Sequence, residues 1–453
     1  MEERNIIAIE IGSSKVKGAL GTYNPSSGIL TVKAVEEEPL LDWVRYGVVS
    51  NVEETSRLVG RVIRKIENGI SPGKVQTVNV SLGGRSCCSM PVDVEYRLPE
   101  EREITDDILL ELRKKVESTP LPDRDLYAVV PREYKIDKSV VVRPKGTVGK
   151  HIVFSANLIT CRPSTYRNLE ILFKNKLQLE IDQKHVRQLA LGDTVLSNEE
   201  RELGCMLVDF GAETTTVSIY KNGYLQYMAT LPLGSRNITR DIMALNILYD
   251  KAEDLKRREG HASGSANTAV QHVNGVDVSV INKSVGLRAT EIIANIKEQI
   301  KLAGFKVSDI HAGIIIVGRG AQLAGFIDRL AEKTSLKIRI GNIYDPKIRF
   351  SDSRISPSDA ADVISLLYRA AIHGAVECLK TEVTDLSEEE VEPEPEPVVQ
   401  TDIPPIEVEA TDTTKKRGFR ARWQTWTEKL GNMLVEPDEI DEEDSVKLTD
   451  DPD

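Results

Sequence analysis

The fold of this chain is decided by residues 9–18, IEIGSSKVKG. An apolar strand carries an acid, Glu10, and a small-residue turn, Gly12-Ser13-Ser14, leads into a returning strand that carries Lys17. Such a turn presents backbone N–H groups and hydroxyls in a tight concavity that suits a phosphate, and Lys17 would reach a phosphate oxygen. Taken alone, the pattern is more typical of an ordinary β-hairpin.

A second turn of the same form lies about 200 residues further along, within CMLVDFGAETTTVSIYKNGYLQYMATLP (205–232). Its strand carries Asp209, and the loop that follows is Gly211-Ala212-Glu213-Thr214. Two facing loops, each preceded by an acid, would hold a polyphosphate between them. Glu10 and Asp209 would then orient a hydrated Mg²⁺. The repetition also predicts two related halves.

A third element, IIIVGRGAQLAG (314–325), is a buried strand with a glycine turn at its C-terminal end, leading into a helix. Nucleotides bind at this place in open α/β sheets. Elsewhere Ile- and Val-rich stretches alternate with amphipathic helical patterns, as in residues 52–70, which predicts an α/β fold. Residues 81–161, with a helix near 106–118, read as an inserted subdomain.

Composition limits the class of protein. The net charge is −12, but residues 1–380 hold 48 acids and 52 bases, so the acidity lies in residues 381–453. A body of this length predicts at least two domains. The start, MEERNIIAIEIG, predicts no secretory signal, and no apolar run approaches the ~20 residues that span a bilayer. Five cysteines without a CxxC pair indicate buried thiols in a reducing cytosol, and the six histidines lack metal-ligand spacing.

Residues 381–453 read as a linker, a short helix and a tail. Residues 381–414 contain twelve acids and no base, and residues 436–453 contain ten acids and one lysine. Between them, residues 415–435 predict an amphipathic helix. Its expected apolar face is Phe419, Trp423, Trp426, Leu430, Met433 and Leu434, flanked or opposed by Arg417, Arg420, Arg422 and Lys429.

This pattern favours insertion into the interface of an anionic bilayer. A groove on a partner protein and docking on the chain's own body are the alternatives. The acidic linker would be repelled by an anionic leaflet and would hold the body off the surface. We also hypothesise that the acidic tail competes for the helix arginines and so weakens membrane affinity.

The three turns resemble, in order and spacing, those of the actin/Hsp70/hexokinase superfamily, where they form the phosphate-1, phosphate-2 and adenosine motifs. More narrowly, the chain resembles the FtsA family of actin-like bacterial division proteins. The narrower resemblance is carried by RYGVVSN (45–51), PREYKID (131–137), RPKGTVG (143–149), LITC (158–161) and ERELG (200–204). It covers residues 1–380 and resumes at the tryptophan-bearing helix.

The resemblance implies an actin-like two-domain ATPase fold with ATP bound in the cleft between the domains. The implied parts are a first domain (1–80 and 162–194), an inserted subdomain (81–161), a second domain (195–380), a linker (381–414), a membrane-targeting helix (415–435) and an acidic tail (436–453). The implied nucleotide-binding residues are Gly12, Ser13, Ser14, Lys17, Asp209, Gly211, Ala212, Glu213, Thr214, Gly234, Glu253, Lys256, Gly318, Arg319 and Gly320.

Several positions depart from the family pattern. Ala212 and Glu213 stand where the phosphate-2 loop usually has glycines, and Glu213 adds a negative charge beside a site meant for phosphates. Thr216 replaces a frequent Asp, and Ser365 replaces a glycine expected in the last helix. Arg319 replaces a glycine of the adenosine motif, where it would stack on adenine, offset Glu213 or crowd the pocket. We therefore expect nucleotide binding with weak or absent hydrolysis, and no residue to activate water is evident.

The function implied by the resemblance is that of a membrane adaptor in cell division. The chain would polymerise head to tail, bind the C-terminal peptide of FtsZ, recruit further division proteins and sit peripherally on the cytoplasmic face of the membrane at the septum. Its partners would be FtsZ, further copies of itself, other division proteins and anionic lipid, with no nucleic acid. The alternatives are a small-molecule or sugar kinase of the same superfamily and a different actin-like scaffold.

Overall fold

The predicted hairpin at the start of the chain is present in the computed structural model, which describes residues 2–70, 72–265, 272–273 and 275–380. Strand β1 (Arg4–Ile11) pairs antiparallel with β2 (Lys15–Asn24), from Arg4 opposite Tyr23 to Ile11 opposite Val16. Alternate side chains of β1 enter different hydrophobic clusters, one containing Ile6 and the other containing Ile7. This strand is therefore buried on both faces, as expected at the centre of a covered sheet.

The hairpin belongs to a six-stranded sheet of order β12-β7-β1-β2-β3-β20. Strands β7 and β12 run parallel to their neighbours, and β3 continues the antiparallel meander. The further strands are β3 (Ile29–Pro39), β7 (Thr77–Leu82), β12 (Glu180–Val186) and β20 (Ile348–Phe350).

Helix α1 (Val52–Asn68) covers one face of this sheet and confirms the amphipathic pattern read at residues 52–70. The helix begins after Asn51, whose side-chain oxygen accepts the backbone N–H of Glu54 at 3.0 Å. Such a cap satisfies one of the amides that a helix start leaves without a partner. The buried side chains of α1 and of η1 (Ile171–Lys176) share a cluster with that face of the sheet.

A second sheet has nine strands in the order β10-β9-β11-β8-β15-β14-β13-β18-β19. The predicted strand–turn–strand repeat forms its centre, where β13 pairs antiparallel with β14 and parallel with β18. The strands from the centre of this sheet to its β19 edge are β15 (Tyr224–Leu231), β14 (Thr215–Lys221), β13 (Cys205–Phe210), β18 (Ile314–Val317) and β19 (Ile338–Ile340). The helices in this half are α6 (Ser235–Met243), α7 (Tyr249–Arg258), α8 (Val278–Leu302) and α9 (Phe326–Thr334).

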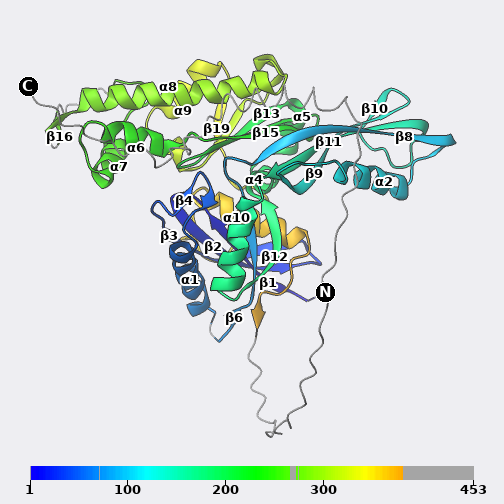
Figure 1. The fold of residues 1–453 in the computed structure, drawn as a ribbon, viewed down its shortest axis with the longest axis horizontal. Helices are drawn as coiled ribbons and strands as arrows, with labels where there is room; N and C mark the ends of the chain where they lie inside the picture. Colours follow the sequence, from blue (N-terminus) through cyan, green and yellow to red (C-terminus); the bar gives the residue numbers. More distant parts are fainter. Residues whose placement is uncertain (1, 71, 266–271, 274, 381–453) are drawn as a thin grey trace, which may run out of the picture. The chain divides into compact units, whose positions relative to one another are not determined.

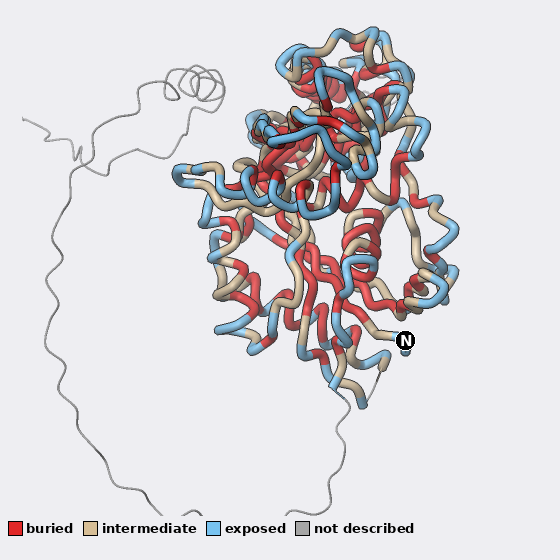
Figure 2. Tube along the Cα trace, turned by 90° about the vertical axis from the view of Figure 1, so that its right-hand side faces the viewer, coloured by how far each residue is buried: buried red, intermediate tan, exposed pale blue. Residues whose placement is uncertain are grey.

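Helices α4 (Arg187–Val195) and α10 (Ala361–Ile372) lie near the junction of the two halves (Figure 1). Their buried side chains belong to the hydrophobic cluster that the two sheets share. The amide of Gln188 on α4 donates to the backbone carbonyl of Leu207 at 3.2 Å, which fastens α4 to the second sheet. Ser365, expected as a glycine, is fully buried and its hydroxyl bonds to that of Thr194 where α10 meets α4. Figure 2 shows that the buried stretches run through the interior.

The segment predicted as an insert continues the second sheet. Its strand β8 pairs with β15 at Cys88 opposite Ala229 and carries the antiparallel strands β11, β9 and β10 outward. The helix expected near 106–118 is α2. These elements are β8 (Cys88–Glu103), α2 (Asp106–Glu117), β9 (Asp125–Ile136), β10 (Ser139–Val141) and β11 (Val148–Cys161).

Short elements complete the described part of the chain. They are β4 (Val44–Arg45), β5 (Val48–Val49), β6 (Lys74–Val75), α3 (Ser164–Glu170), α5 (Asn198–Leu203), β16 (His272–Val273), β17 (Val276–Asp277), η2 (Val307–Asp309), η3 (Arg319–Gln322) and β21 (Leu379–Lys380). The expected linker, amphipathic helix and acidic tail lie outside the described residues. None of the helices described is long and apolar enough to cross a bilayer.

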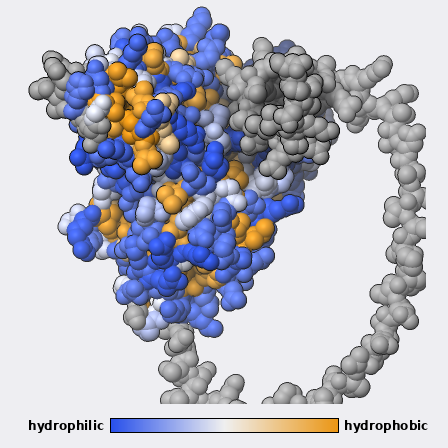
Figure 3. Space-filling view, turned by 60° about the vertical axis from the view of Figure 1, so that its left-hand side comes forward, coloured by the Kyte–Doolittle hydropathy of each residue, from blue (hydrophilic) through white to orange (hydrophobic). Residues whose placement is uncertain are grey.

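Apolar side chains also reach the surface of the second half. Figure 3 shows them gathered on the upper part of one face. Leu248, between α6 and α7, is 83% exposed, and Leu287 on α8 is 67% exposed.

Candidate functional site

The two predicted small-residue turns have the same internal hydrogen bond. In the first, the N–H of Gly12 donates to the carbonyl of Lys15 at 2.9 Å, and in the second the N–H of Gly211 donates to that of Thr214 at 2.9 Å. Each turn follows a strand that carries a buried carboxylate. The similarity expected from the sequence is therefore present in three dimensions.

Both turns open onto one cleft of about 600 Å³ that also reaches the glycine turn after β18. Three segments that lie far apart in the sequence thus meet at one cavity. The sequence-predicted residues that line it are Gly12, Ser13, Ser14, Lys17, Asp209, Gly211, Ala212, Thr214, Glu253, Lys256, Gly318, Arg319 and Gly320, together with Glu10.

Glu213 is not among the lining residues and has a different role from the one expected. Its side chain is fully buried and pairs with Arg236 at 3.1 Å and with Arg240 at 2.9 Å. It also accepts the backbone N–H of Tyr46 at 2.6 Å. A third guanidinium, that of Arg45, lies 3.7 Å from the same carboxylate. Because three guanidinium groups surround Glu213, they offset the repulsion of phosphates that its charge would otherwise cause.

Gly234 also lies outside the residues that line the cleft, and it packs closely against the loop that contains Ala212 and Glu213. A Cβ at this position would stand 2.3 Å from the carbonyl oxygen of Ala212 and 2.5 Å from the nitrogen of Glu213. Gly234 caps the start of α6, and its missing side chain lets that helix approach the loop closely. Thr216, where the family often has Asp, is buried and shares a hydroxyl hydrogen bond with Thr230.

Arg236 joins the two halves of the molecule. Its guanidinium donates to the backbone carbonyl of Ser13 at 2.9 Å and to Asp42 at 3.3 Å, as well as to Glu213. Burial lowers the pKa of Arg236, but Tyr249 and Glu213 more than compensate and raise it above its ordinary value. Arg236 therefore connects the loop that contains Glu213 to the turn that contains Ser13 through a charged group that stays protonated.

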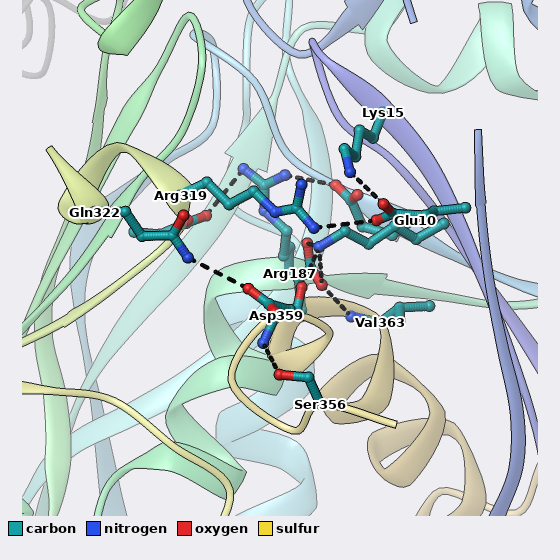
Figure 4. Close-up of polar contacts among 12 residues, drawn as sticks. Glu10, Lys15, Arg187, Arg319, Gln322, Ser356, Asp359 and Val363 are labelled. Atoms are coloured by element: carbon teal, nitrogen blue, oxygen red, sulfur yellow. Dashed lines mark hydrogen bonds and ion pairs between the residues drawn. The ribbon is translucent and has the colours of Figure 1, made fainter. Parts of the chain in front are cut away.

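The floor of the cleft is formed by Glu10, Arg187 and Asp209. Arg187, the first residue of α4, contacts Glu10 through Nη1 at 2.6 Å and Asp209 through Nη2 at 3.0 Å. Figure 4 shows the guanidinium beside Glu10. Burial raises the pKa of Glu10 to about 7, against the attraction of Arg187. Burial lowers the pKa of Arg187, but Asp209 and Glu10 more than offset this and raise it.

This arrangement does not fit the hydrated Mg²⁺ expected between Glu10 and Asp209. Mg²⁺ requires an octahedron of oxygen ligands, whereas a guanidinium already bridges these two carboxylates. Within the part of the chain that the structure describes, no cluster of three or more His, Cys, Asp or Glu side chains is arranged to hold a metal ion. Glu10 and Asp209, which were expected to orient a hydrated Mg²⁺ through water, are partners of Arg187 in this structure.

Lys17 is turned toward α10. Its ammonium donates to both oxygens of Asp362, at 2.9 and 2.8 Å, and to the carbonyl of Asp359 at 2.7 Å. Burial lowers the pKa of Lys17, but Asp362 and Glu10 raise it above its usual value. In this structure Lys17 therefore pairs with a carboxylate at the edge of the cleft, where a phosphate would have to compete for it.

Glu253 and Lys256, expected beside the adenosine, form an ion pair on α7 in which Lys256 is buried and Glu253 is partly exposed. The Lys256 ammonium donates to Glu253 at 2.7 Å and to the hydroxyl of Thr239 at 2.9 Å. Burial lowers the pKa of Lys256. Gly318 and Gly320 make room for protein as well as for a ligand, because a Cβ at either position would meet Phe210 within 2.7 Å.

Two contacts cross the mouth of the cleft. Arg319 pairs with Glu37 on β3 at 3.3 Å, and the amide of Gln322 donates to Asp359 at 3.3 Å (Figure 4). Arg319 therefore offsets Glu37 and not Glu213, which was one of the alternatives read from the sequence.

Sequence reasoning missed Arg187, Arg236 and Asp362. Arg187 is 177 residues from Glu10, so no local pattern connects the two. The signals available were an arginine where a strand passes into a helix and an acid at the start of the last helix, both of which are common in structural roles.

The family model described as "Cell division protein FtsA" matches residues 206–361. The chain is 28% identical to the cell division protein FtsA of Porphyromonas gingivalis, over 80% of this chain and 77% of that protein. It is 25% identical to the FtsA of Pseudomonas aeruginosa, over 76% of this chain and 84% of that protein.

A solved structure titled "PilM-PilN type IV pilus biogenesis complex" is similar in fold. Its TM-score is 0.56 at 17% identity, and the match covers 82% of this chain and 98% of that one. The likeness supports the two-sheet architecture described above.

Proposed function

Because the chain is a relative of cell division protein FtsA and has an actin-like fold, we propose that it is an ATP-binding membrane adaptor of bacterial division. In this proposal the body, residues 1–380, binds ATP in the cleft and assembles head to tail into filaments. Residues 415–435 attach the filament to the cytoplasmic face of the membrane at the septum, and the second half binds the C-terminal peptide of FtsZ.

The observation that carries the proposal is the meeting of three distant segments at one cleft. The phosphate-1 turn, the phosphate-2 loop and the glycine turn after β18 line the same 600 Å³ cavity. Seven basic and five acidic side chains line it, so its formal charge favours an anionic ligand. ATP, with a polyphosphate at one end and an aromatic base at the other, suits a cleft that is lined both by charged side chains and by the glycine turn with Gly318 and Gly320.

The floor of the cleft supports binding without efficient hydrolysis. Activating a water molecule requires a group that is free to accept a proton. Glu10 and Asp209 both contact Arg187, although Asp209 Oδ2 accepts no hydrogen bond within the described part of the chain, and Asp362 is paired with Lys17. This also disfavours the kinase alternative, which needs a carboxylate free to face an acceptor hydroxyl.

The inserted segment supports the filament part of the proposal. Its strands extend the second sheet and end at β10, an edge strand that carries the exposed side chain of Val140. In a head-to-tail filament every copy presents one surface to the copy ahead and a different surface to the copy behind. We assign residues 81–161 to one of these contacts, as the resemblance implies.

Co-sedimentation with vesicles tests the membrane part. The full chain should pellet with vesicles containing anionic lipid, and more so with ATP, because polymerisation multiplies the affinity of a single helix. Trp423→Glu places a charge on the apolar face and should leave the protein in the supernatant. Thr425→Glu adds the same charge off that face and should pellet nearly as the wild type does. Equal pelleting of the two variants would contradict the proposal.

A second measurement addresses the partner. A peptide with the C-terminal sequence of FtsZ should bind the full chain, and the Trp423→Glu variant should bind it equally, because the proposed peptide site lies in the body. Loss of peptide binding together with membrane binding would indicate that Trp423→Glu disturbs the whole molecule.

A further inference from the structure

The side chain of Arg187 occupies the position between the two cleft carboxylates. Glu10 lies near the end of β1, and Asp209 lies near the end of β13. One guanidinium contacts both carboxylates through separate nitrogens, at 2.6 Å from Glu10 and 3.0 Å from Asp209. The arginine side chain is only 16% exposed. Glu10 therefore accepts a hydrogen bond from Arg187, whereas Asp209 is an ion-pair partner of Arg187 and its buried Oδ2 accepts no hydrogen bond from the residues that the structure describes.

Arg187 is fixed at this place by its backbone. It stands between Val186, at the buried end of β12, and Gln188, whose amide donates to Leu207 on the second sheet. The next residues of α4, Leu189 and Ala190, are buried in the core shared by the two sheets. The guanidinium cannot leave the cleft floor without either breaking this packing or leaving Glu10 and Asp209 as unpaired buried charges, which is costly.

The guanidinium retains donors for a ligand. An arginine carries five N–H donors in a planar fork, and the contacts to Glu10 and Asp209 engage one nitrogen each. Arginine binds phosphate oxygens well and keeps its charge at every physiological pH. Arg187 is thus placed to do for a polyphosphate what a divalent cation would do: it supplies positive charge between the two carboxylates and the phosphate oxygens.

We propose that Arg187 replaces the divalent metal ion, so that this cleft binds a nucleoside di- or triphosphate without Mg²⁺. The inference rests on the nucleotide binding proposed above and makes it more specific. It also names a positioning role for Arg187, which would hold the two carboxylates away from the phosphates and orient the polyphosphate along the floor.

The test is nucleotide binding by the full chain, measured by calorimetry with ATP and with ADP, once in excess Mg²⁺ and once in EDTA. The dissociation constant should change by less than about threefold between the two conditions, since a metal-bridged polyphosphate site would lose about tenfold or more in EDTA. The measurement on the wild-type protein needs no variant and does not depend on hydrolysis.

Variants show whether Arg187 is responsible. Arg187→Ala frees both carboxylates, so ATP binding in EDTA should fall about tenfold or more, and Mg²⁺ should restore part of it. Arg187→Lys keeps the charge but reaches only one carboxylate, so it should lie between wild type and Arg187→Ala while preserving the fold. The matched control is Arg288→Ala, which removes an arginine paired with Asp241 outside the cleft and should bind ATP as the wild type does in both conditions.

Each outcome decides a different point. Equal binding by wild type with and without Mg²⁺, together with a metal requirement in Arg187→Ala, supports the inference. Binding by wild type only in Mg²⁺ overturns it but leaves the proposed ATP site in place. Binding in neither condition overturns the inference and also removes ATP from the proposed function, while the membrane experiment stands apart from both.

Discussion

The carboxylate of Glu213 accepts a hydrogen bond from the backbone N–H of Tyr46 at 2.6 Å, although 167 residues separate them in the sequence. Glu213 belongs to the phosphate-2 loop, and Tyr46 lies between β4 and β5 on the phosphate-1 side. Arg236 adds a parallel connection, from the same carboxylate to the carbonyl of Ser13. These residues form a polar latch that holds the two phosphate turns at a fixed distance.

Removing Glu213 should destabilise the protein substantially. Glu213→Ala leaves Arg236, which is 4% exposed, without its buried counter-ion. Breaking a buried ion pair by removing one partner costs about 3–5 kcal/mol of unfolding free energy, so the urea midpoint should fall clearly. The control is Glu332→Ala, which removes an exposed partner of Arg329 and should change stability by about 0.5 kcal/mol or less. Equal midpoints for the two variants would show that the latch does not stabilise the fold.

Alanine should be harmful at one glycine and favourable at another: Gly234→Ala should weaken nucleotide binding, and Gly60→Ala should stabilise the fold. Gly234→Ala introduces a Cβ 2.3 Å from the carbonyl oxygen of Ala212, so the phosphate-2 loop must move and nucleotide binding should weaken about tenfold or more. Gly60→Ala, on α1, meets only ordinary contacts, the nearest heavy atom being 3.4 Å away on Leu177. It should stabilise the protein by about 0.5–1 kcal/mol, because alanine favours a helix interior over glycine. Thermal unfolding and calorimetric titration of both variants check this pair.

His185 should make stability depend on pH. Burial, helped by Arg369 and His373, lowers the pKa of His185 to about 3 in the folded protein, whereas the unfolded chain has the ordinary value near 6.5. The contribution of the neutral His185 to the free energy of unfolding is fully present above about pH 6.5. It falls as the pH drops, by up to about 1.4 kcal/mol per pH unit, because the unfolded state takes up the proton that the folded state refuses.

His185→Gln should therefore reduce the slope of unfolding free energy against pH between about 6 and 4. His311→Gln, which replaces an exposed histidine, serves as the control and should retain the wild-type slope. Identical slopes in all three proteins would contradict the prediction.

The cysteines should resist modification while the chain is folded. Cys161, Cys205 and Cys378 are at most 1% exposed, and burial raises the pKa of Cys205 and of Cys378 to about 12. Since the thiolate is the reactive form, Ellman's reagent at pH 8 should label these three residues only as fast as the protein unfolds. The urea-unfolded chain, in which all five cysteines are accessible, gives the reference rate. Rapid labelling of the native protein at these three positions would contradict the burial described here.

The sequence by itself determined the local elements and the kind of cleft. The Gly12 turn, the Gly211 turn and the α1 pattern each depend on residues within a few positions of one another, because turns and helices are closed by hydrogen bonds over three or four residues. Their order along the chain then indicated the actin-like resemblance, which the fold confirms.

Only the tertiary structure decided how the charged side chains pair. Arg187 lies 177 residues from Glu10, and Arg319 lies 282 residues from Glu37, so no local pattern indicates either pair. The sequence suggested a metal ion between Glu10 and Asp209 and a repulsive charge at Glu213, and the fold instead gives each of these carboxylates an arginine. The physical reason is that a buried charge must find an opposite charge, and which one it finds depends on which segments the two sheets bring together.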